Sequence, residues 1–228
     1  MIYAMSDLHG CYDKYVKMLE KIKFNDKDTL YILGDIVDRG PDGIKILQDV
    51  INNRINVFVL CGNHENMASR VLKVLTYSSD MYEDDNLPEI YRNWIVDGGT
   101  PTFEAFMELE YKDKTRLLSY MSRSLLFEEI EVNGKKFHLS HTVPNKKTMR
   151  AHERMPYYDY LIGEPEYEKE YFPDKIIVTG HTPTGFIDPK FKGKIWRGNN
   201  HIAIDCGAVF GNPLGCICLD TLEEFYVE

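Results

Sequence analysis

Short apolar runs along the chain end repeatedly in clusters of aspartate, histidine, asparagine and glycine. The runs and the clusters that follow them are IYAM with SDLHG, TLYIL with GDIVDRG, NVFVL with CGNHEN, KFHL with SHT, KIIV with TGHTP, and HIAI with DCGAVFGN. Each run has four or five residues and is rich in Ile, Val, Leu, Tyr or Phe, a pattern typical of buried strands. We therefore expect the chemistry of this protein at the ends of strands.

Apolar residues at helical spacing separate the first three runs. These residues are Tyr12, Tyr15, Val16 and Leu19 after the first run, and Ile44, Leu47, Val50 and Ile51 after the second. Alternating strands and helices predict parallel strands joined by right-handed crossovers. In such sheets a ligand binds outside the carboxyl ends of the strands, which is where the polar clusters stand.

The stretch from about 66 to 125 has no strand signal and predicts a helical insertion. Within it, Thr100 is expected to cap a helix that Pro101 opens. The acidic run DMYEDD at 80–85 is expected to form a solvated loop. The insertion therefore adds helices to the sheet without interrupting the order of its strands.

A hairpin signal follows the insertion. Asn133-Gly134 stands between the apolar segments LLFEEIEV and KKFHLS, which predicts a two-residue turn and an antiparallel second half of the sheet. No linker divides the chain, so we predict a single domain over residues 1–228, with an α/β fold.

The composition is that of an ordinary globular protein, with 43% hydrophobic and 28% charged residues. The formal net charge of -9 argues against binding to a nucleic-acid polymer or an acidic membrane, because both need a cationic surface. No apolar run reaches the length that spans a bilayer.

The five cysteines are an odd number, and Cys216 and Cys218 lie in an apolar run. We therefore expect free thiols and a cytoplasmic location.

Six polar residues at the predicted strand ends form a candidate metal site. They are Asp7, His9, Asp35, Asn63, His141 and His181. Taken singly, each has a simpler explanation as a helix cap, a turn residue or an ordinary histidine, but their coincidence at one edge of one sheet favours metal ligation. Carboxylate, amide and imidazole ligands suit Mn, Fe or Zn. Six ligands exceed one tetrahedral site, so we predict two divalent ions, with manganese preferred, that share a bridging carboxylate.

The motifs SDLHG, GDIVDRG and GNHEN, with the later His141 and GHTP, resemble those of the phosphoprotein phosphatase superfamily, especially its short bacterial and phage members. The resemblance covers almost the whole chain, including the closing segment IDCGAVFGNPLGCICLD. It implies a four-layer sandwich in which two mixed β-sheets are flanked by helices. It also implies a division of the ligands, in which Asp7 and His9 bind the first metal, Asp35 bridges, and Asn63, His141 and His181 bind the second.

Three further residues acquire roles from the same resemblance. His64 would donate a proton to the leaving oxygen, while Asp38 would orient its ring. Arg39 would hold phosphate oxygens through its planar guanidinium group. The implied reaction is direct attack on phosphorus by a hydroxide that bridges the two metals, without a covalent enzyme intermediate.

One position departs from the pattern of the short phage members. A second phosphate-binding arginine is expected a little over twenty residues after His141, and Glu164 stands there instead. Arg150 or Arg154 could replace the missing arginine. We predict that Glu164 lines the outer cleft and disfavours polyphosphate substrates, because a carboxylate repels a phosphate dianion.

The leading prediction from the sequence is a phosphomonoesterase acting on phosphoserine or phosphothreonine in proteins or peptides. The alternative is a symmetrical dinucleoside tetraphosphatase, which would need a surface on which bases stack. Candidate aromatic residues for that surface are Tyr77, Tyr82, Tyr91 and Trp94, and helix packing is their simpler role. A hypothesis from another class, a catalytically silent metal-binding scaffold, predicts a gap among the ligands or at the acid, and the sequence has none.

Overall fold

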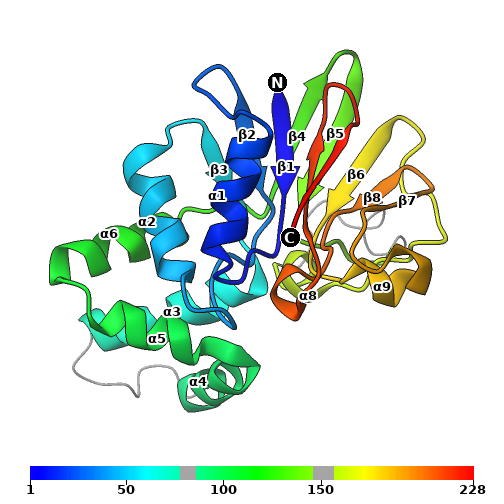
Figure 1. Cartoon of the computed structure of the whole chain (residues 1–228). Coiled ribbons are helices and arrows are strands. Elements are labelled where there is room, and N and C mark those ends of the chain that lie inside the picture. Colours follow the sequence, from blue (N-terminus) through cyan, green and yellow to red (C-terminus); the bar gives the residue numbers. More distant parts are fainter. Residues whose placement is uncertain (78–85, 146–156) are drawn as a thin grey trace.

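Two five-stranded β-sheets lie face to face in the computed structural model of the chain, with helices outside them (Figure 1). The structure describes residues 1–77, 86–145 and 157–228. The predicted acidic loop at 80–85, Tyr82, Arg150 and Arg154 lie outside the described residues. The predicted α/β fold with two mixed sheets flanked by helices is confirmed.

The first sheet has the strand order β10-β9-β1-β2-β3. Its strands are β1 (Ile2–Met5), β2 (Thr29–Ile32), β3 (Val57–Val59), β9 (Leu214–Cys218) and β10 (Glu224–Val227). The helices α1 (Tyr12–Lys21), α2 (Gly43–Asn53) and α3 (Asn63–Tyr77) follow β1, β2 and β3 in turn. The strands β1, β2 and β3 are parallel, as the alternating pattern predicts, and β9 and β10 add two antiparallel neighbours. Because β1 points downward in Figure 1, the carboxyl ends of these three strands face the lower edge.

The second sheet has the order β4-β5-β6-β8-β7. Its strands are β4 (Phe127–Val132), β5 (Lys135–Ser140), β6 (Lys175–Thr179), β7 (Trp196–Gly198) and β8 (His201–Ala203). Asn133 and Gly134 have φ of 51° and 77° and join β4 to β5, which confirms the predicted hairpin. The prediction of an antiparallel second half was wrong for β5, β6 and β8, which are parallel. The long connections through α8 (Asp159–Ile162) and α9 (Thr184–Ile187) return the chain to the same end of the sheet, so these strands run in one direction.

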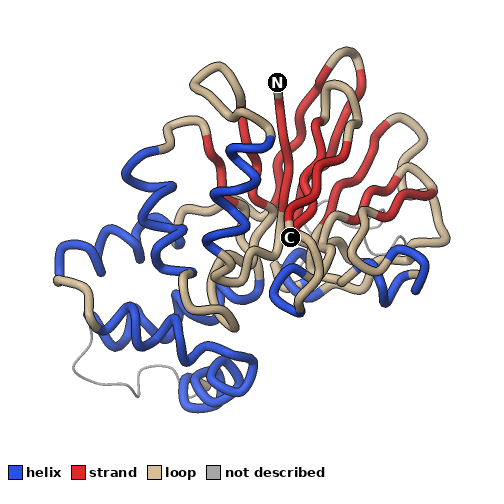
Figure 2. Tube along the Cα trace, viewed as in Figure 1, coloured by secondary structure: helices blue, strands red, loops and turns tan. Residues whose placement is uncertain are grey.

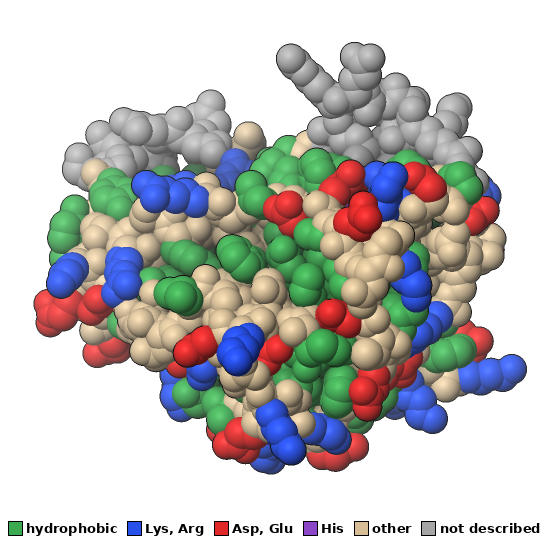
Figure 3. All heavy atoms as spheres, turned by 90° about the horizontal axis from the view of Figure 1, so that it is seen from above, with side chains coloured by type: hydrophobic (Ala, Val, Ile, Leu, Met, Phe, Trp, Pro, Cys, Tyr) green, Lys and Arg blue, Asp and Glu red, His purple; other side chains and the backbone are tan. Residues whose placement is uncertain are grey.

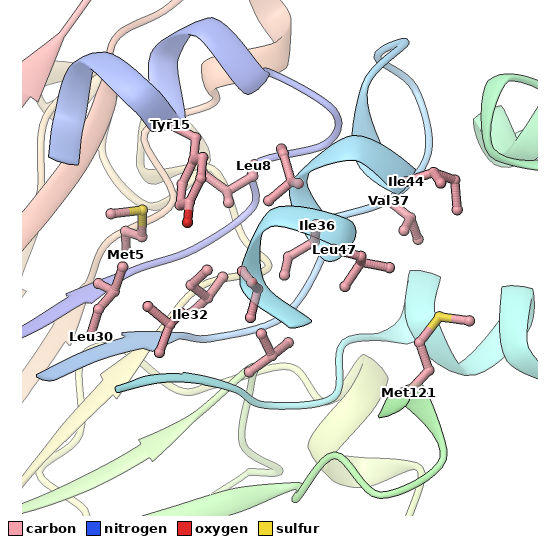
Figure 4. Close-up of a cluster of buried hydrophobic side chains, with 14 of the residues drawn as sticks. Met5, Leu8, Tyr15, Leu30, Ile32, Ile36, Val37, Ile44, Leu47 and Met121 are labelled. Atoms are coloured by element: carbon pink, nitrogen blue, oxygen red, sulfur yellow. The ribbon is translucent and has the colours of Figure 1, made fainter. Parts of the chain in front are cut away.

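Three buried clusters separate the layers. The largest lies between the first sheet and its helices, and Met5 of β1, Tyr15 of α1 and Leu47 of α2 belong to it (Figure 4). Ala4, the neighbour of Met5, belongs to the second cluster between the two sheets, because successive side chains of a strand point to opposite faces. The third cluster lies outside the second sheet and includes Tyr160 of α8. The order helices, sheet, sheet, helix and loops is that of the expected four-layer sandwich.

The predicted insertion consists of helices in its described part, and it extends beyond the first sheet (Figure 2). After α3 come α4 (Leu87–Trp94), a π-helical turn η1 (Ile95–Gly99), α5 (Thr100–Met107) and α6 (Tyr111–Met121). The predicted cap at Thr100 was wrong: Thr100 is already helical, and the preceding Gly99 makes no side-chain cap. The chain kinks at Gly98, whose φ of 101° suits glycine, and so passes from α4 into α5 without a conventional start signal.

The surface at the amino end of β1 carries lysine, arginine, aspartate and glutamate side chains that are intermingled, with no large basic patch among the described atoms in that view (Figure 3). None of the described helices is long and apolar enough to cross a membrane. All five cysteines are free thiols, and β9 buries Cys216 and Cys218 as the apolar run predicts.

Candidate active site

The six predicted metal ligands meet where the carboxyl ends of both sheets come together. Asp7 and His9 follow β1, Asp35 follows β2, Asn63 begins α3, His141 follows β5 and His181 follows β6. The expectation that all six lie at the edge of one sheet was wrong, because His141 and His181 come from the second sheet. Each sheet therefore supplies part of the site, and the stacking of the sheets assembles it.

Backbone strain is concentrated at these positions. The site residues in the left-handed region of φ are Asp7 (52°), His9 (40°), Asp35 (54°), Asp38 (71°), Arg39 (66°) and His181 (68°). Such conformations are unusual for residues other than glycine and persist only where surrounding contacts impose them. Close packing explains the accompanying glycines, since a Cβ on Gly62 would clash with the Asp35 carboxylate and one on Gly180 with that of Asp7.

Hydrogen-bond acceptors crowd around Nε2 of His141. This atom lies 3.0 Å from Asn63 Oδ1, 3.1 Å from His181 Nδ1 and 3.4 Å from Asp35 Oδ2. The other ring nitrogen, Nδ1, donates to the carbonyl oxygen of Leu33 at 2.8 Å, so the neutral ring presents a bare lone pair at Nε2. The lone pairs of these atoms point toward one another, and there are too few protons to join all of them by hydrogen bonds. A cation would satisfy these lone pairs, and imidazole, amide and carboxylate ligands suit the predicted second metal.

A second group of ligand atoms lies on the other side of Asp35. His9 donates from Nδ1 to the carbonyl oxygen of Val37 at 2.9 Å, which turns its Nε2 toward Asp35 Oδ2 at 3.7 Å. Nε2 of His9 accepts a hydrogen bond from Arg39 at 2.8 Å, so a cation at this atom would displace that contact. Asp7 Oδ2 accepts the backbone N–H of His181 at 2.9 Å, which ties the end of the first sheet to the second. Asp35 Oδ2 thus lies between the two groups, where the resemblance places the bridging ligand.

Burial favours the neutral form of the histidines and of the carboxyl groups among the predicted ligands. Burial, together with the charges of nearby His64 and Arg39, lowers the pKa of His9 to about 2, and burial lowers that of His181 to about 4. Both imidazoles are therefore neutral ligands at physiological pH. Burial and neighbouring acidic charge raise the pKa of Asp7 and of Asp35 well above the usual range. Ionising both carboxyl groups is costly without a compensating positive charge.

His64 and Asp38 form a fully buried pair beside the ligands. His64 Nδ1 lies 2.7 Å from Asp38 Oδ2, and the same oxygen accepts the indole N–H of Trp94 at 2.8 Å. The backbone N–H of Asp38 donates to Thr102 Oγ1 at 2.8 Å. Nε2 of His64 faces the ligands, 3.9 Å from Asp35 Oδ2. The contact with Asp38 holds the His64 ring in one orientation, and Trp94 and Thr102 of the insertion hold Asp38 in place.

Arg39 reaches across the mouth of the site. Its guanidinium group donates to His64 Nε2 at 3.0 Å and to Asp97 Oδ1 at 3.0 Å, and its backbone N–H donates to the Gly98 carbonyl at 2.8 Å. The side chain of Asp97 is 46% exposed, so this ion pair lies at the solvent boundary. Arg39 is thus positioned at the opening of the site, where a phosphate group would arrive.

Two acidic residues with contacts in the site were not among the predicted site residues. Glu65 is fully buried, and its carboxylate accepts backbone N–H groups from Asp35, Ile36, Val37 and Gly62 at 2.8 to 3.2 Å. Its place in the GNHEN motif was the available signal. Asp97 lies 3.4 Å from His64 Nε2, but an aspartate within a helical insertion carries no such signal.

The other candidate residues have mixed outcomes. Glu164 is exposed, and the carbonyl of its neighbour Gly163 accepts a hydrogen bond from Thr142, which follows His141. Its predicted role in the outer cleft stays a prediction.

Among the aromatic candidates for base stacking, Trp94 is completely buried and cannot stack on a base, so helix packing explains it. Tyr77 and Tyr91 are partly exposed.

A large groove lies away from these residues. Its volume is about 1000 Å³, and it runs between β3 and α6, with Arg54, Arg116 and Arg123 among its lining side chains. None of the predicted ligands lines it. We place the active site at the ligand cluster, because strained backbone and converging acceptor atoms occur together there.

Comparison with known proteins finds symmetrical bis(5'-nucleosyl)-tetraphosphatases among the curated relatives. A symmetrical bis(5'-nucleosyl)-tetraphosphatase from Wigglesworthia glossinidia brevipalpis is 39% identical over 89 residues, which are 39% of this chain and 32% of that protein. Another from Buchnera aphidicola subsp. Schizaphis graminum (strain Sg) is 38% identical over 102 residues, 41% of this chain and 37% of that protein. The match thus covers well under two thirds of the length of these curated relatives.

Solved structures share the fold over the whole chain. A protein described as a candidate diadenosine tetraphosphatase has a TM-score of 0.63 at 15% identity, covering 99% of this chain and 92% of its own. A serine/threonine phosphatase from Saccharomyces cerevisiae has a TM-score of 0.59 at 14% identity, covering 100% of this chain and 80% of its own. At these identities the likeness concerns the fold alone.

The family model described as calcineurin-like phosphoesterase matches residues 1–185, which include every predicted metal ligand. This match and the shared fold confirm the resemblance that the motifs SDLHG, GDIVDRG and GNHEN indicate. The chain belongs to the calcineurin-like phosphoesterase family.

Proposed function

We propose that this protein is a phosphoesterase that uses two divalent metal ions, held by Asp7 and His9 on one side of Asp35 and by Asn63, His141 and His181 on the other. The observation that carries this proposal is the convergence of acceptor atoms on His141 Nε2, at 3.0 to 3.4 Å, with too few protons to separate them. When bound, the ions would supply positive charge to the phosphoryl oxygens and lower the pKa of a water molecule. Manganese is our first choice, with iron and zinc as alternatives.

Two residues of the chain would take part in the reaction beside the metal ligands. His64 would give a proton from Nε2 to the leaving oxygen, and the hydrogen bond from Nδ1 to Asp38 keeps that nitrogen pointing into the site. Arg39 would leave its contacts with His9 and with Nε2 of His64 and bind phosphate oxygens through two parallel N–H groups. The strained turns hold these groups in place before the substrate arrives, so little reorganisation is needed during the reaction.

We propose a dinucleoside tetraphosphate, cleaved symmetrically, as the substrate. The curated relatives carry this activity in their names, and they favour the alternative from the sequence analysis over its leading prediction of a serine/threonine protein phosphatase. The matched segments cover only 32% and 37% of these relatives, so the proposed substrate rests on similarity to part of each protein. A phosphoprotein substrate stays the second candidate, and a silent scaffold the third. The free thiols suit the proposed cytoplasmic location.

Turnover measurements test the proposed reaction. Protein stripped with a chelator is assayed on a dinucleoside tetraphosphate, a phosphopeptide and an alkyl phosphate, before and after addition of Mn, Fe or Zn. We expect no turnover without metal, recovery with metal, and the highest kcat/KM on the dinucleoside tetraphosphate. Asp35→Asn should lose nearly all activity because the shared negative charge is removed. Full activity in chelator contradicts the metal proposal, and a preference for phosphopeptide contradicts the proposed substrate.

A further inference from the structure

An exposed phenylalanine lies beside the phosphate-binding arginine. The ring of Phe210 is 61% exposed, and the guanidinium carbon of Arg39 lies 5.6 Å from the ring centre. Single exposed aromatic residues are common on protein surfaces and need no explanation by themselves. Phe210 differs from such residues because it contacts a group that we place in the substrate site.

The loop around Phe210 is held in a defined conformation. Phe210 ends the short 3₁₀ turn η3 (Ala208–Phe210), which lies between Gly207 and Gly211, both with φ near 80°. Lys14 of α1 donates to the carbonyl oxygens of Ala208 and Asn212 at 3.2 and 2.6 Å. The amide of Asn212 donates to the carbonyl of Gly207 at 3.2 Å, which closes the loop on itself. A ring that the core does not bury is therefore presented to solvent by a fixed support.

Arg39 contacts both the ring and the proton donor. Its guanidinium group lies 3.0 Å from His64 Nε2, and its guanidinium carbon lies 5.6 Å from the centre of the Phe210 ring. A phosphate bound by Arg39 would have the leaving oxygen near His64, and the rest of the substrate could extend across the face of Phe210. Trp94 of the insertion does not offer this arrangement, since it is buried. A flat aromatic group attached through phosphate fits the exposed ring face, because every nucleobase has such a π-face.

We propose that Phe210 is a base-binding residue that stacks on a nucleobase of the substrate whose phosphates Arg39 holds. This assignment rests on the proposed hydrolysis of dinucleoside tetraphosphates, and it adds a subsite for the base. The competing explanation is structural: Phe210 only positions Arg39 through a cation–π contact. The two explanations differ in the effect they predict for Phe210→Ala on hydrolysis of a substrate that has no base. Loss of stacking would leave that hydrolysis unchanged, whereas a displaced Arg39 would impair it.

Steady-state kinetics of the Mn-loaded enzyme separate these explanations. The substrates are diadenosine tetraphosphate and inorganic tetraphosphate, which lacks bases. For Phe210→Ala we expect KM for the dinucleotide to rise about tenfold with kcat unchanged, because stacking stabilises ground and transition states alike. The constants for inorganic tetraphosphate should not change. Phe210→Trp should restore KM, and Tyr111→Ala, which removes another exposed ring from α6, should change neither substrate.

Fluorescence provides a second measurement that does not require turnover. Emission from the new indole in Phe210→Trp should be quenched by ADP but not by inorganic pyrophosphate. Equal losses on both substrates for Phe210→Ala, or no loss on either, would overturn the stacking proposal. If the unmodified protein does not hydrolyse diadenosine tetraphosphate, the proposed substrate fails, and the fluorescence result alone decides the role of Phe210. Quenching by ADP then supports base stacking, and its absence overturns it.

Discussion

His64 is a fully buried histidine whose only charged partner at Nδ1 among the described residues is Asp38. A proton donor matters most when the leaving group is a poor one, because a stable leaving anion hardly needs protonation. We predict that His64→Asn lowers kcat on an alkyl phosphate about 100-fold or more, and on an activated aryl phosphate less than about tenfold. Measured kcat values on the two substrates check this directly. Equal losses would remove His64 from the role of general acid.

Glu65 positions the loop that carries Asp35 by accepting backbone N–H groups with both carboxylate oxygens. Burial raises its pKa, and the hydrogen bonds from Asp35, Val37 and Ile36 oppose that effect. In Glu65→Gln the amide NH₂ would face N–H donors, so about two of these hydrogen bonds are lost. We predict a loss of about 2 to 4 kcal/mol in the free energy of unfolding, together with lower kcat/KM on every substrate.

Urea unfolding measures this loss, and Glu104→Gln on the exposed surface of α5 serves as its control. If the Glu65 carboxylate only supported the fold, Glu65→Gln would lower the free energy of unfolding and leave Mn affinity unchanged. Because Glu65 orients the loop of Asp35, Mn affinity should fall as well, and the apparent Kd for Mn should rise. Unchanged Mn affinity in a destabilised Glu65→Gln protein would contradict the positioning role.

The sequence predicts individual site residues well where a motif is local, and poorly where the contact is distant. Asp7, His9 and Asn63 belong to short motifs at strand ends, so spacing along the chain is enough to select them. Asp97 reaches His64 only because the insertion folds back over the loop after β2. No local pattern encodes that approach, since it depends on the kink at Gly98 and on the packing of α4 and α5.

The insertion is the element whose contribution to the site can be tested most simply. Trp94 at the end of α4 donates its indole N–H to Asp38 Oδ2, the oxygen that also binds His64. Trp94→Phe keeps an aromatic ring but removes the donor. We predict a stability loss of about 1 to 3 kcal/mol, because a buried hydrogen bond to a carboxylate is lost. On an alkyl phosphate kcat should fall more than on an activated aryl phosphate, because Asp38 is less firmly held and no longer fixes the ring of the proton donor His64.

Tyr91→Phe is the matched control for this change. Tyr91 belongs to the same helix and packs edge-on against Phe103, with ring centres 6.3 Å apart. Tyr91→Phe should leave both stability and kcat on the alkyl phosphate nearly unchanged. If Trp94→Phe lowers stability without lowering kcat on the alkyl phosphate, the insertion supports the fold but does not influence the proton donor.

At the level of elements, periodic segments were predicted and irregular ones were not. The parallel unit β1–α1–β2–α2–β3 follows from apolar runs separated by amphipathic helices. The strand β7 has only three residues and β10 is half-buried, and neither carries an apolar run of four or five residues. The parallel pairing of β5, β6 and β8 depends on the long connections between these strands. The hydrophobic periodicity of a strand does not indicate in which direction it runs.

For the whole molecule, the division of ligands between two sheets links metal binding to folding. Asp7 and Asp35 come from the first sheet, and His141 and His181 from the second, so the ligand set exists only when the sheets are stacked. A ligand that binds the folded state alone stabilises it by about 2.7 kcal/mol at a concentration 100 times its Kd. For a domain of this size, that corresponds to a rise in Tm of about 5 to 10 °C.

The stabilisation of the folded state by bound metal should depend on pH. The buried carboxyl groups determine whether it grows or shrinks as pH rises. Burial raises the pKa of Asp7 and Asp35 well above the usual range and that of Asp205 to about 6. A raised pKa in the folded state contributes stability below the unfolded pKa, near 4, and that contribution is lost as pH rises through the folded value. The lowered pKa of His9 and His181 acts in the opposite sense, costing stability as pH falls below about 6.5. Bound cations compensate the carboxylate charges, and at low pH they must displace protons from the carboxyl groups.

We therefore predict that the gain in Tm on adding Mn to chelator-treated protein is larger at pH 7.5 than at pH 5.0. Differential scanning calorimetry with and without Mn measures it at both pH values. Asp35→Asn provides the sharpest comparison, because it keeps the size of the side chain and removes a buried charge that repels Asp7. Without metal at pH 7.5 this variant should melt above the unmodified protein, and it should gain much less from Mn. An equal gain at both pH values, or an Asp35→Asn protein that melts lower without metal, would show that the buried carboxylates do not couple metal binding to the stability of the stacked sheets.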